Sequence, residues 1–189
     1  MKSLNNFIAG LAKVVTKIVE ICHWVAVALM AAATVCSVAA PSAVNYFVGF
    51  DAKECCGVEL AVYGFEINAQ MTNGQVDMTA FLMFGISAVL ILSLMAMVFR
   101  NLHLIIKKSE GTTPFQPDNV RMLREVGIFA ISVPLVGYAM SIITRIVLGV
   151  DNAEIAVSYS GFVIGLVVLC MTQYFARGIE LENDVDGLL

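Results

Sequence analysis

The amino-acid sequence predicts an all-α membrane protein, with four transmembrane helices in an antiparallel bundle and a small extracytoplasmic loop in which a β-hairpin is expected. The first observation is composition: 59% of the 189 residues are hydrophobic and 14% are charged, whereas soluble domains are about half apolar and about a quarter charged. The second observation is a set of four runs without Asp, Glu, Lys or Arg, at residues 21–44, 78–99, 126–144 and 155–176.

Charged residues at the edges of these runs, such as Arg100, Arg145 and Arg177, are the third observation. Runs of about 20 residues cross a hydrocarbon core about 30 Å thick, and a charge at its centre costs about 2.5–3.5 kcal/mol. The alternative is a soluble protein with four buried core helices. Four uncharged runs in so short a chain disfavour it.

The distribution of Lys and Arg predicts the orientation. Nine of the eleven lie in the N-terminal arm, in the linker between the second and third runs, or in the C-terminal tail. The positive-inside rule therefore places these three segments in the cytoplasm. The predicted order is one membrane domain with a cytoplasmic arm at 1–20, spans at 21–44, 78–99, 126–147 and 155–176, external segments at 45–77 and 148–154, a cytoplasmic elbow at 100–125 and a cytoplasmic tail at 177–189.

The N-terminal arm allows two interpretations. Its apolar residues recur at three- and four-residue spacing, so it either lies on the inner leaflet or extends the first span as one helix. Small residues at 36–43 also offer sites for signal-peptide cleavage, although the charged region before them is long for a signal peptide.

The external segment at 45–77 is expected to contain the β-hairpin. It is rich in strand-forming residues, and Asn73-Gly74 is a strong hairpin signal. On the fourth span, Gly161 and Gly165 form a GxxxG step, which allows two helix backbones to approach closely. This step indicates either a seam between copies in a homo-oligomer or packing inside one bundle.

The elbow is the one compact charged stretch between the spans. The helix of the second span is expected to run on and stop at Gly111, and Pro117 suits the first turn of a new amphipathic helix, where its missing N–H loses nothing. Arg121 and Arg124 share a face of that helix, because they are three residues apart.

The sequence of this elbow, GTTPFQPDNVRMLREVG, resembles the signature of a bacterial membrane-protein family known as domain of unknown function 2975 (DUF2975). The tail FARGIELENDVDGLL is similar to that family's second motif. The resemblance implies four spans and a cytoplasmic face built from both motifs, but no reaction. The candidate interaction residues are Pro114, Phe115, Asn119, Arg121, Arg124, Glu180, Glu182, Asn183 and Asp184.

Within this face the resemblance suggests an ion pair. Arg121 or Arg124 is expected to bind a carboxylate of Glu180, Glu182 or Asp184, with the tail folded under the bundle. The alternative is a solvated tail, with the arginines at lipid phosphates.

The sequence has no motif for catalysis, a cofactor or a metal. CxxC, HExxH, the P-loop and the dinucleotide fingerprint are all missing, so we expect no enzyme and no cofactor. Cys55 and Cys56 are adjacent on the external side, where they either form a disulfide or stay free thiols. Arg145, with Asp151 and Glu154, forms a candidate outer polar site, which either anchors the helix at headgroups or takes part in ion binding.

These observations favour a regulatory, scaffold or immunity-type protein of the bacterial cytoplasmic membrane, surrounded by membrane lipid and engaging a cytoplasmic regulatory protein. The mild net charge of -4 argues against direct nucleic-acid binding. A small-molecule or lipid carrier with a cavity between its spans is the alternative, and an oligomeric pore is a third interpretation. The regulatory, scaffold or immunity interpretation rests on analogy with other small multi-span proteins. Fold alone does not define function.

Overall fold

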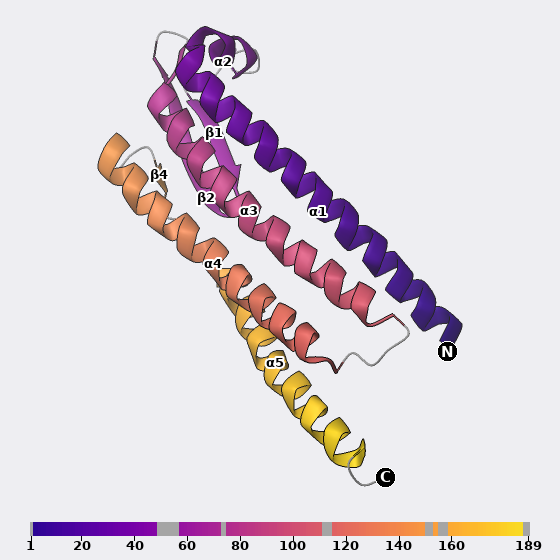
Figure 1. The fold of residues 1–189 in the computed structure, drawn as a ribbon. Coiled ribbons are helices and arrows are strands. Elements are labelled where there is room, and N and C mark those ends of the chain that lie inside the picture. Colours follow the sequence, from indigo (N-terminus) through magenta and orange to yellow (C-terminus); the bar gives the residue numbers. More distant parts are fainter. Residues whose placement is uncertain are drawn as a thin grey trace. The chain divides into compact units, whose positions relative to one another are not determined.

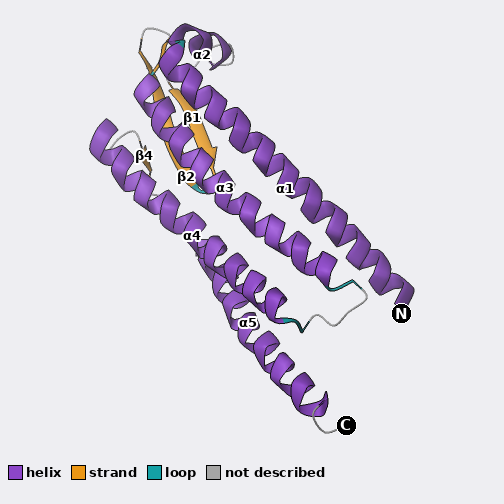
Figure 2. Ribbon diagram, in the orientation of Figure 1, coloured by secondary structure: helices purple, strands orange, loops and turns teal. Residues whose placement is uncertain are grey.

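The computed structural model describes residues 2–48, 57–72, 75–110, 115–149, 153–154 and 159–186. The helices of the described residues are α1 (Lys2–Ala39), α2 (Pro41–Val48), α3 (Met78–Lys108), α4 (Pro117–Leu148) and α5 (Tyr159–Asp186) (Figure 1). Figure 2 separates them from the strands, which are β1 (Gly57–Val62), β2 (Phe65–Thr72), β3 (Gln75–Val76) and β4 (Ala153–Glu154).

Four of these helices are long and apolar enough to cross a membrane. The qualifying segments are Phe7–Ala39, Met78–Lys108, Pro117–Leu148 and Tyr159–Leu181, with mean hydropathies of 2.0, 2.5, 2.1 and 1.7. Large apolar side chains such as Leu29 and Ile164 are exposed on them, as expected for surfaces that lipid covers. The prediction of an all-α fold with four long apolar helices is confirmed, and it supports a multi-pass membrane protein.

The arm and the first span form one helix. α1 is continuous over 38 residues, from Lys2 to Ala39, so the arm extends the first span. At the elbow, α3 runs on to Lys108 and α4 begins at Pro117, where the proline was expected. α3 and α4 therefore extend beyond the uncharged runs that predict them, whereas α1 ends at Ala39, before the end of the predicted span at 21–44, and α2 begins at Pro41.

The chain divides into two compact units, which are described separately. The first, here the charged unit, consists of Met1–His23, Leu94–Ser132 and Ser160–Leu189. The second, here the sheet unit, consists of Trp24–Ser93 and Val133–Tyr159.

The strands on either side of Asn73-Gly74 pair antiparallel, as the predicted hairpin requires, and the sheet unit contains a second, longer hairpin that was not predicted separately. β1 pairs antiparallel with β2 from Gly57↔Gln70 to Val62↔Phe65. The turn between them is Tyr63-Gly64, with φ angles of 46° and 82°, the pattern of a type I′ turn, which needs positive φ at both central residues. β3 pairs with the end of β2 across Asn73-Gly74, which lies outside the described residues, and β4 pairs with β2 at Glu66 and Ile67.

One face of β2 forms the core of the sheet unit. Phe65, Ile67 and Ala69 are almost fully buried, and their spacing of two residues places them on one face of the strand. The Phe65 ring stacks on Phe84 of α3, with centroids 6.4 Å apart. A Cβ on Gly137 of α4 would lie 3.8 Å from the Cβ of Phe65, so α4 also packs against this residue.

Candidate functional site

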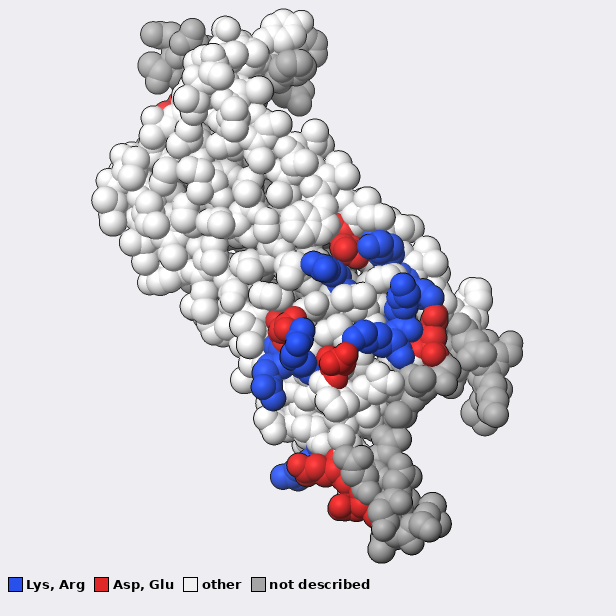
Figure 3. Space-filling model, in the orientation of Figure 1, with Lys and Arg blue, Asp and Glu red and all other residues white. Residues whose placement is uncertain are grey.

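The polar residues of the charged unit lie at the ends of the long helices. Lys and Arg side chains are interspersed with Asp and Glu on the face drawn in Figure 3, and do not form a patch of one sign. Such a mixture favours local ion pairs. The pairs described below connect the start of α1 to α3 and the end of α3 to the start of α4.

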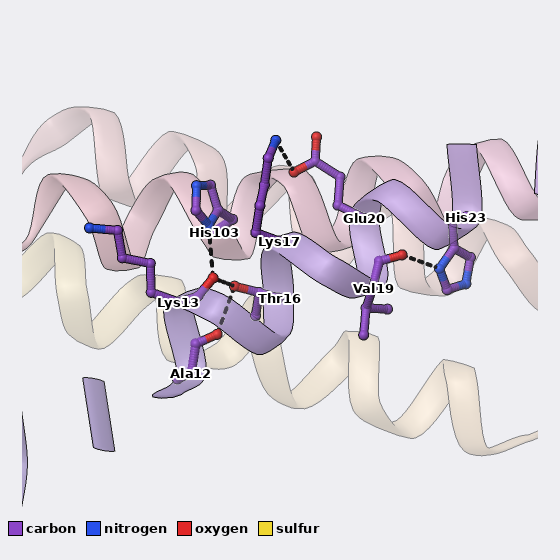
Figure 4. A network of polar contacts seen from close by, with 8 residues as sticks. All are labelled: Ala12, Lys13, Thr16, Lys17, Val19, Glu20, His23 and His103. Atoms are coloured by element: carbon purple, nitrogen blue, oxygen red, sulfur yellow. Dashed lines mark hydrogen bonds and ion pairs between the residues drawn. The ribbon is translucent and has the colours of Figure 1, made fainter. Parts of the chain in front are cut away.

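The first set of contacts connects α1 and α3. Lys13 Nζ lies 2.6 Å from Glu110 Oε2. The Lys13 carbonyl accepts two further hydrogen bonds, one from His103 Nδ1 at 3.1 Å and one from the Thr16 hydroxyl at 3.1 Å (Figure 4). Because a carbonyl only accepts, the His103 proton must be on Nδ1. Two contacts at one residue therefore fix the start of α1 against α3.

The same helices meet again where the uncharged runs 21–44 and 78–99 begin and end. The His23 ring lies 5.3 Å from the Phe99 ring, and His23 Nδ1 bonds the Val19 carbonyl at 2.8 Å. Glu20 is buried and pairs with Lys17 at 3.0 Å (Figure 4). An ion pair between residues one helical turn apart therefore lies where the polar part of α1 ends.

The second set of contacts closes the elbow between α3 and α4. Lys108 Nζ lies 2.7 Å from Asp118 Oδ2, and the Asn119 side-chain amide donates to Ser109 Oγ at 3.1 Å. The Lys108 hydrogen bond and charge hold the pKa of the Asp118 carboxyl below its ordinary value, and Arg121 adds a smaller effect of the same sign. Asp118 also stands in the first turn of α4, where a negative charge favours the helix.

Asn119 and Glu125 attach the next turns of α4 to α3. Asn119 is only 1% exposed, and Asn101 of α3 donates to Glu125 Oε2 at 3.0 Å. A hydrogen bond to a charged group is worth about 1.5–3 kcal/mol. The first two turns of α4 are therefore held to α3 by their polar side chains.

The third set of contacts attaches α5 to the elbow and to α4. The Phe115 and Phe175 rings lie 5.5 Å apart, and a Cβ on Gly178 would lie 2.6 Å from the Phe115 ring. A Cβ on Gly165 would lie 2.9 Å from the Gly127 carbonyl of α4. The predicted Gly165 contact is thus made inside this chain, and Gly161 lies one turn before it on α5.

The predicted interaction residues separate into two groups. Phe115 and Asn119 contact other helices of the charged unit. Arg121 and Arg124 are exposed, and Arg121 Nε lies 3.4 Å from Glu125 Oε1. In the residues that the structure describes, no ion pair joins either arginine to Glu180 or Asp184.

The tail continues as helix to Asp186 instead of folding back. Pro114 and the side chains of Glu182 and Asn183 lie outside the described residues. Pairing of an arginine with Glu182 therefore stays a prediction.

The other predicted sites lie in the sheet unit or near it. Arg145 is half-buried in the last turn of α4. The backbone of Glu154 in β4 lies opposite that of Glu66 in β2, as antiparallel strand partners. Asp151, Cys55 and Cys56 lie outside the described residues. Among the described cysteines Cys22, Cys36 and Cys170 are free thiols.

Sequence reasoning missed the residues that hold the elbow together. Lys13, Asn101, His103 and Glu110 were placed on the inner side or passed over, although each makes a contact between helices. One signal was available in the sequence: polar residues follow Phe99 on α3, at spacings that place them on one or two faces of the helix. Their partners depend on which helices are neighbours.

The fold and its polar end define a class: a multi-pass α-helical membrane protein whose long helices are joined by ion pairs at one end. Comparisons of the chain with protein-family models, with curated proteins and with solved structures found no match in any of the three. The resemblance to DUF2975 thus rests on the two motifs alone. In the described part of the chain no group of three His, Cys, Asp or Glu residues is placed to hold a metal ion.

Proposed function

We propose that this chain is a non-enzymatic regulatory, scaffold or immunity-type protein of the bacterial cytoplasmic membrane, with both termini inside, and that it binds a cytoplasmic partner through α4. One observation carries the proposal. Asp118 and Glu125 are bound to α3, and Asn119 to Ser109 directly after it. The side chains of Arg121 and Arg124 on the same helix segment are exposed.

A fixed helix that carries exposed arginines suits recognition. The contacts to α3 restrict the backbone before a partner arrives, which lowers the entropic cost of binding. Arginine bonds carboxylates through two parallel N–H groups, so its orientation matters as well as its charge. The side chain of Arg121 is 76% exposed, and its pair with Glu125 is a surface pair worth about 0–1 kcal/mol. A partner carboxylate can therefore replace Glu125 at small cost.

The partner that these features favour is a protein with an acidic surface. Membership in the DUF2975 family is part of the same proposal, because the two exposed arginines belong to the motif that resembles that family. The tail motif supplies Asp184, which is exposed on α5 and is available for basic residues of the same partner.

Crosslinking in native membranes tests the proposal. A photo-activated crosslinker is placed at Pro117, which is exposed at the start of α4 and leaves both arginines and the contacts to α3 in place. Captured proteins are compared between wild type, Arg124→Glu and Lys107→Glu. Lys107 is an exposed cation at the end of α3 and controls for net charge. We expect Arg124→Glu to lower capture about tenfold, the effect of about 1.4 kcal/mol, and Lys107→Glu to leave it unchanged. Equal capture by all three proteins would overturn the proposal.

A further inference from the structure

The outward face of α5 changes character in a fixed order along the helix. Val163 and Val167 are exposed and apolar. Cys170, Gln173, Tyr174 and Arg177 follow and line a pocket of about 270 Å³. Glu180 and Asp184 come next and are exposed. Steps of three and four residues keep all of these side chains on one side of an α-helix.

This side of α5 is opposite its packed side. Gly165 and Thr172 are buried, and Phe175 and Gly178 contact Phe115 of the elbow. These contacts fix the rotation of α5 about its axis. They leave the Tyr174 side chain pointing outward, with the residue 73% exposed.

We propose that this pocket binds the headgroup of a phospholipid with a zwitterionic primary amine, such as phosphatidylethanolamine. The chemical order along α5 matches the order of groups in that lipid. Apolar residues meet the acyl chains, Gln173 and Tyr174 offer hydrogen bonds at the level of the glycerol and phosphate, and Arg177 meets the phosphate. Glu180 then meets the ammonium group.

Charge favours this lipid over an anionic one. Arg177 has no ion pair in the described residues, so its guanidinium is available for two parallel hydrogen bonds to a phosphate. Glu180 lies three residues further along, about 4.5 Å in helix rise, comparable with the two-carbon separation of phosphate and amine in ethanolamine. A headgroup with a second negative charge or a neutral polyol gains nothing from Glu180 and Asp184.

The position of the pocket also suits a lipid. The last uncharged run ends at Ala176, so Tyr174 and Arg177 lie where the apolar surface ends. Tyrosine and arginine are both enriched at such interfaces, since one end of each side chain is apolar and the other polar. This inference does not depend on the proposed partner of α4.

Native mass spectrometry of the full chain in a mild detergent tests the site. The purified protein is titrated with dioleoyl phosphatidylethanolamine or dioleoyl phosphatidylglycerol, and one-to-one adducts are measured. We expect tighter binding of phosphatidylethanolamine. Arg177→Gln should weaken both lipids about tenfold, as for the loss of one hydrogen bond between charged groups. Glu180→Gln should weaken phosphatidylethanolamine alone and remove the preference.

Controls separate this site from general lipid adhesion. Arg124→Gln removes one exposed arginine outside the pocket and should leave both affinities unchanged. Glycerophosphoethanolamine, the headgroup without acyl chains, should not compete at equal concentration, and full competition would show a soluble ligand instead of a lipid. Equal effects of Arg177→Gln and Arg124→Gln, or a preference that survives Glu180→Gln, would overturn the proposal. Far-UV circular dichroism checks that each variant keeps its helices.

Discussion

At the scale of single residues, glycine determines how closely α4 and α5 approach. A Cβ on Gly165 would lie 2.9 Å from the Gly127 carbonyl and 3.0 Å from the Ile131 nitrogen. Both are backbone atoms, which cannot move aside without shifting the helix. Small residues allow such close contact between membrane helices, where packing replaces the hydrophobic effect as the driving force.

Gly165→Ala is therefore expected to destabilise the protein, although alanine is the better helix former. Overpacking of this kind costs about 1–3 kcal/mol. Gly10→Ala is the matched control, because nothing lies within 4 Å of a Cβ on Gly10 in α1, and it should stabilise the helix by about 0.5–1 kcal/mol. The measurement is the free energy of unfolding in detergent. A Gly165→Ala protein as stable as Gly10→Ala would contradict the close contact.

The sequence predicted the glycine but not its partner. The GxxxG spacing identified Gly165 as a place of close approach and left open whether the neighbour is another copy or another helix of this chain. Gly127 carries no such spacing. A residue pattern along one helix defines the face that packs, whereas the identity of the facing helix depends on connections and on the other three helices.

At the scale of elements, the elbow between α3 and α4 shows the same division. Pro117 and the length of the uncharged runs were sufficient to place the start of α4. The contacts that close the elbow, Lys108–Asp118 and Asn101–Glu125, were not expected. They depend on the angle at which α4 leaves the connection, which no local pattern encodes.

The start of α4 is expected to respond to acid through Asp118. The folded-state pKa of Asp118 lies below its ordinary value of 3.8 because of the hydrogen bond and charge of Lys108. A lowered pKa stabilises the fold at pH values above the ordinary one, and that contribution is lost as pH falls through the folded value. Asp118→Asn should therefore lower the melting temperature at pH 7 and make no difference well below pH 3.8.

Salt provides the second test of this pair. Both side chains are largely exposed to solvent, so raising the ionic strength to about 1 M should shrink the difference at pH 7. The comparison variant is Glu110→Gln, which removes the carboxylate that pairs with Lys13 of α1. A difference at pH 7 that persists unchanged in acid would contradict the role of the Asp118 charge.

The hairpin turn illustrates why element boundaries are hard to place. Asn73-Gly74 carried the stronger signal, and the strands beside it pair as predicted; the longer hairpin, with its turn at Tyr63-Gly64, was not predicted. A glycine at the second turn position was visible, but tyrosine seldom adopts positive φ. Burial of Phe65, Ile67 and Ala69 on one face fixes the strand register and requires the turn just before Phe65. Packing of this face therefore adds a turn that the local sequence signals only weakly.

At the scale of the whole molecule, the distribution of exposed apolar side chains sets what surrounds the chain. The most hydrophobic window of α1 is 6% buried and that of α5 is 11% buried, against 44% for α3. Contiguous apolar patches larger than a few hundred Å² are rare on soluble monomers, whereas apolar side chains are exposed along most of α1 and α5. The sequence predicted this feature well, because composition and run length report the surrounding solvent directly.

The side of the membrane on which each connection lies is the remaining property of the whole molecule that the sequence predicts. α3 has 31 residues, which at about 1.5 Å each gives a length of about 46 Å, enough to cross the hydrocarbon core and extend beyond it. Glu59 of β1 precedes this helix and Lys107 lies at its end, and both are exposed. The two positions must therefore lie on opposite sides if α3 spans the membrane.

Single cysteines at these positions test the orientation. The five native cysteines are replaced, and Glu59→Cys or Lys107→Cys is labelled with a maleimide that does not cross membranes. Since basic residues remain in the cytoplasm, Glu59→Cys should be labelled in intact cells and Lys107→Cys only after permeabilisation. The reverse pattern would invert the orientation and place Arg121 and Arg124 outside, away from any cytoplasmic partner. Labelling of both positions in intact cells would show that α3 does not cross the membrane at all.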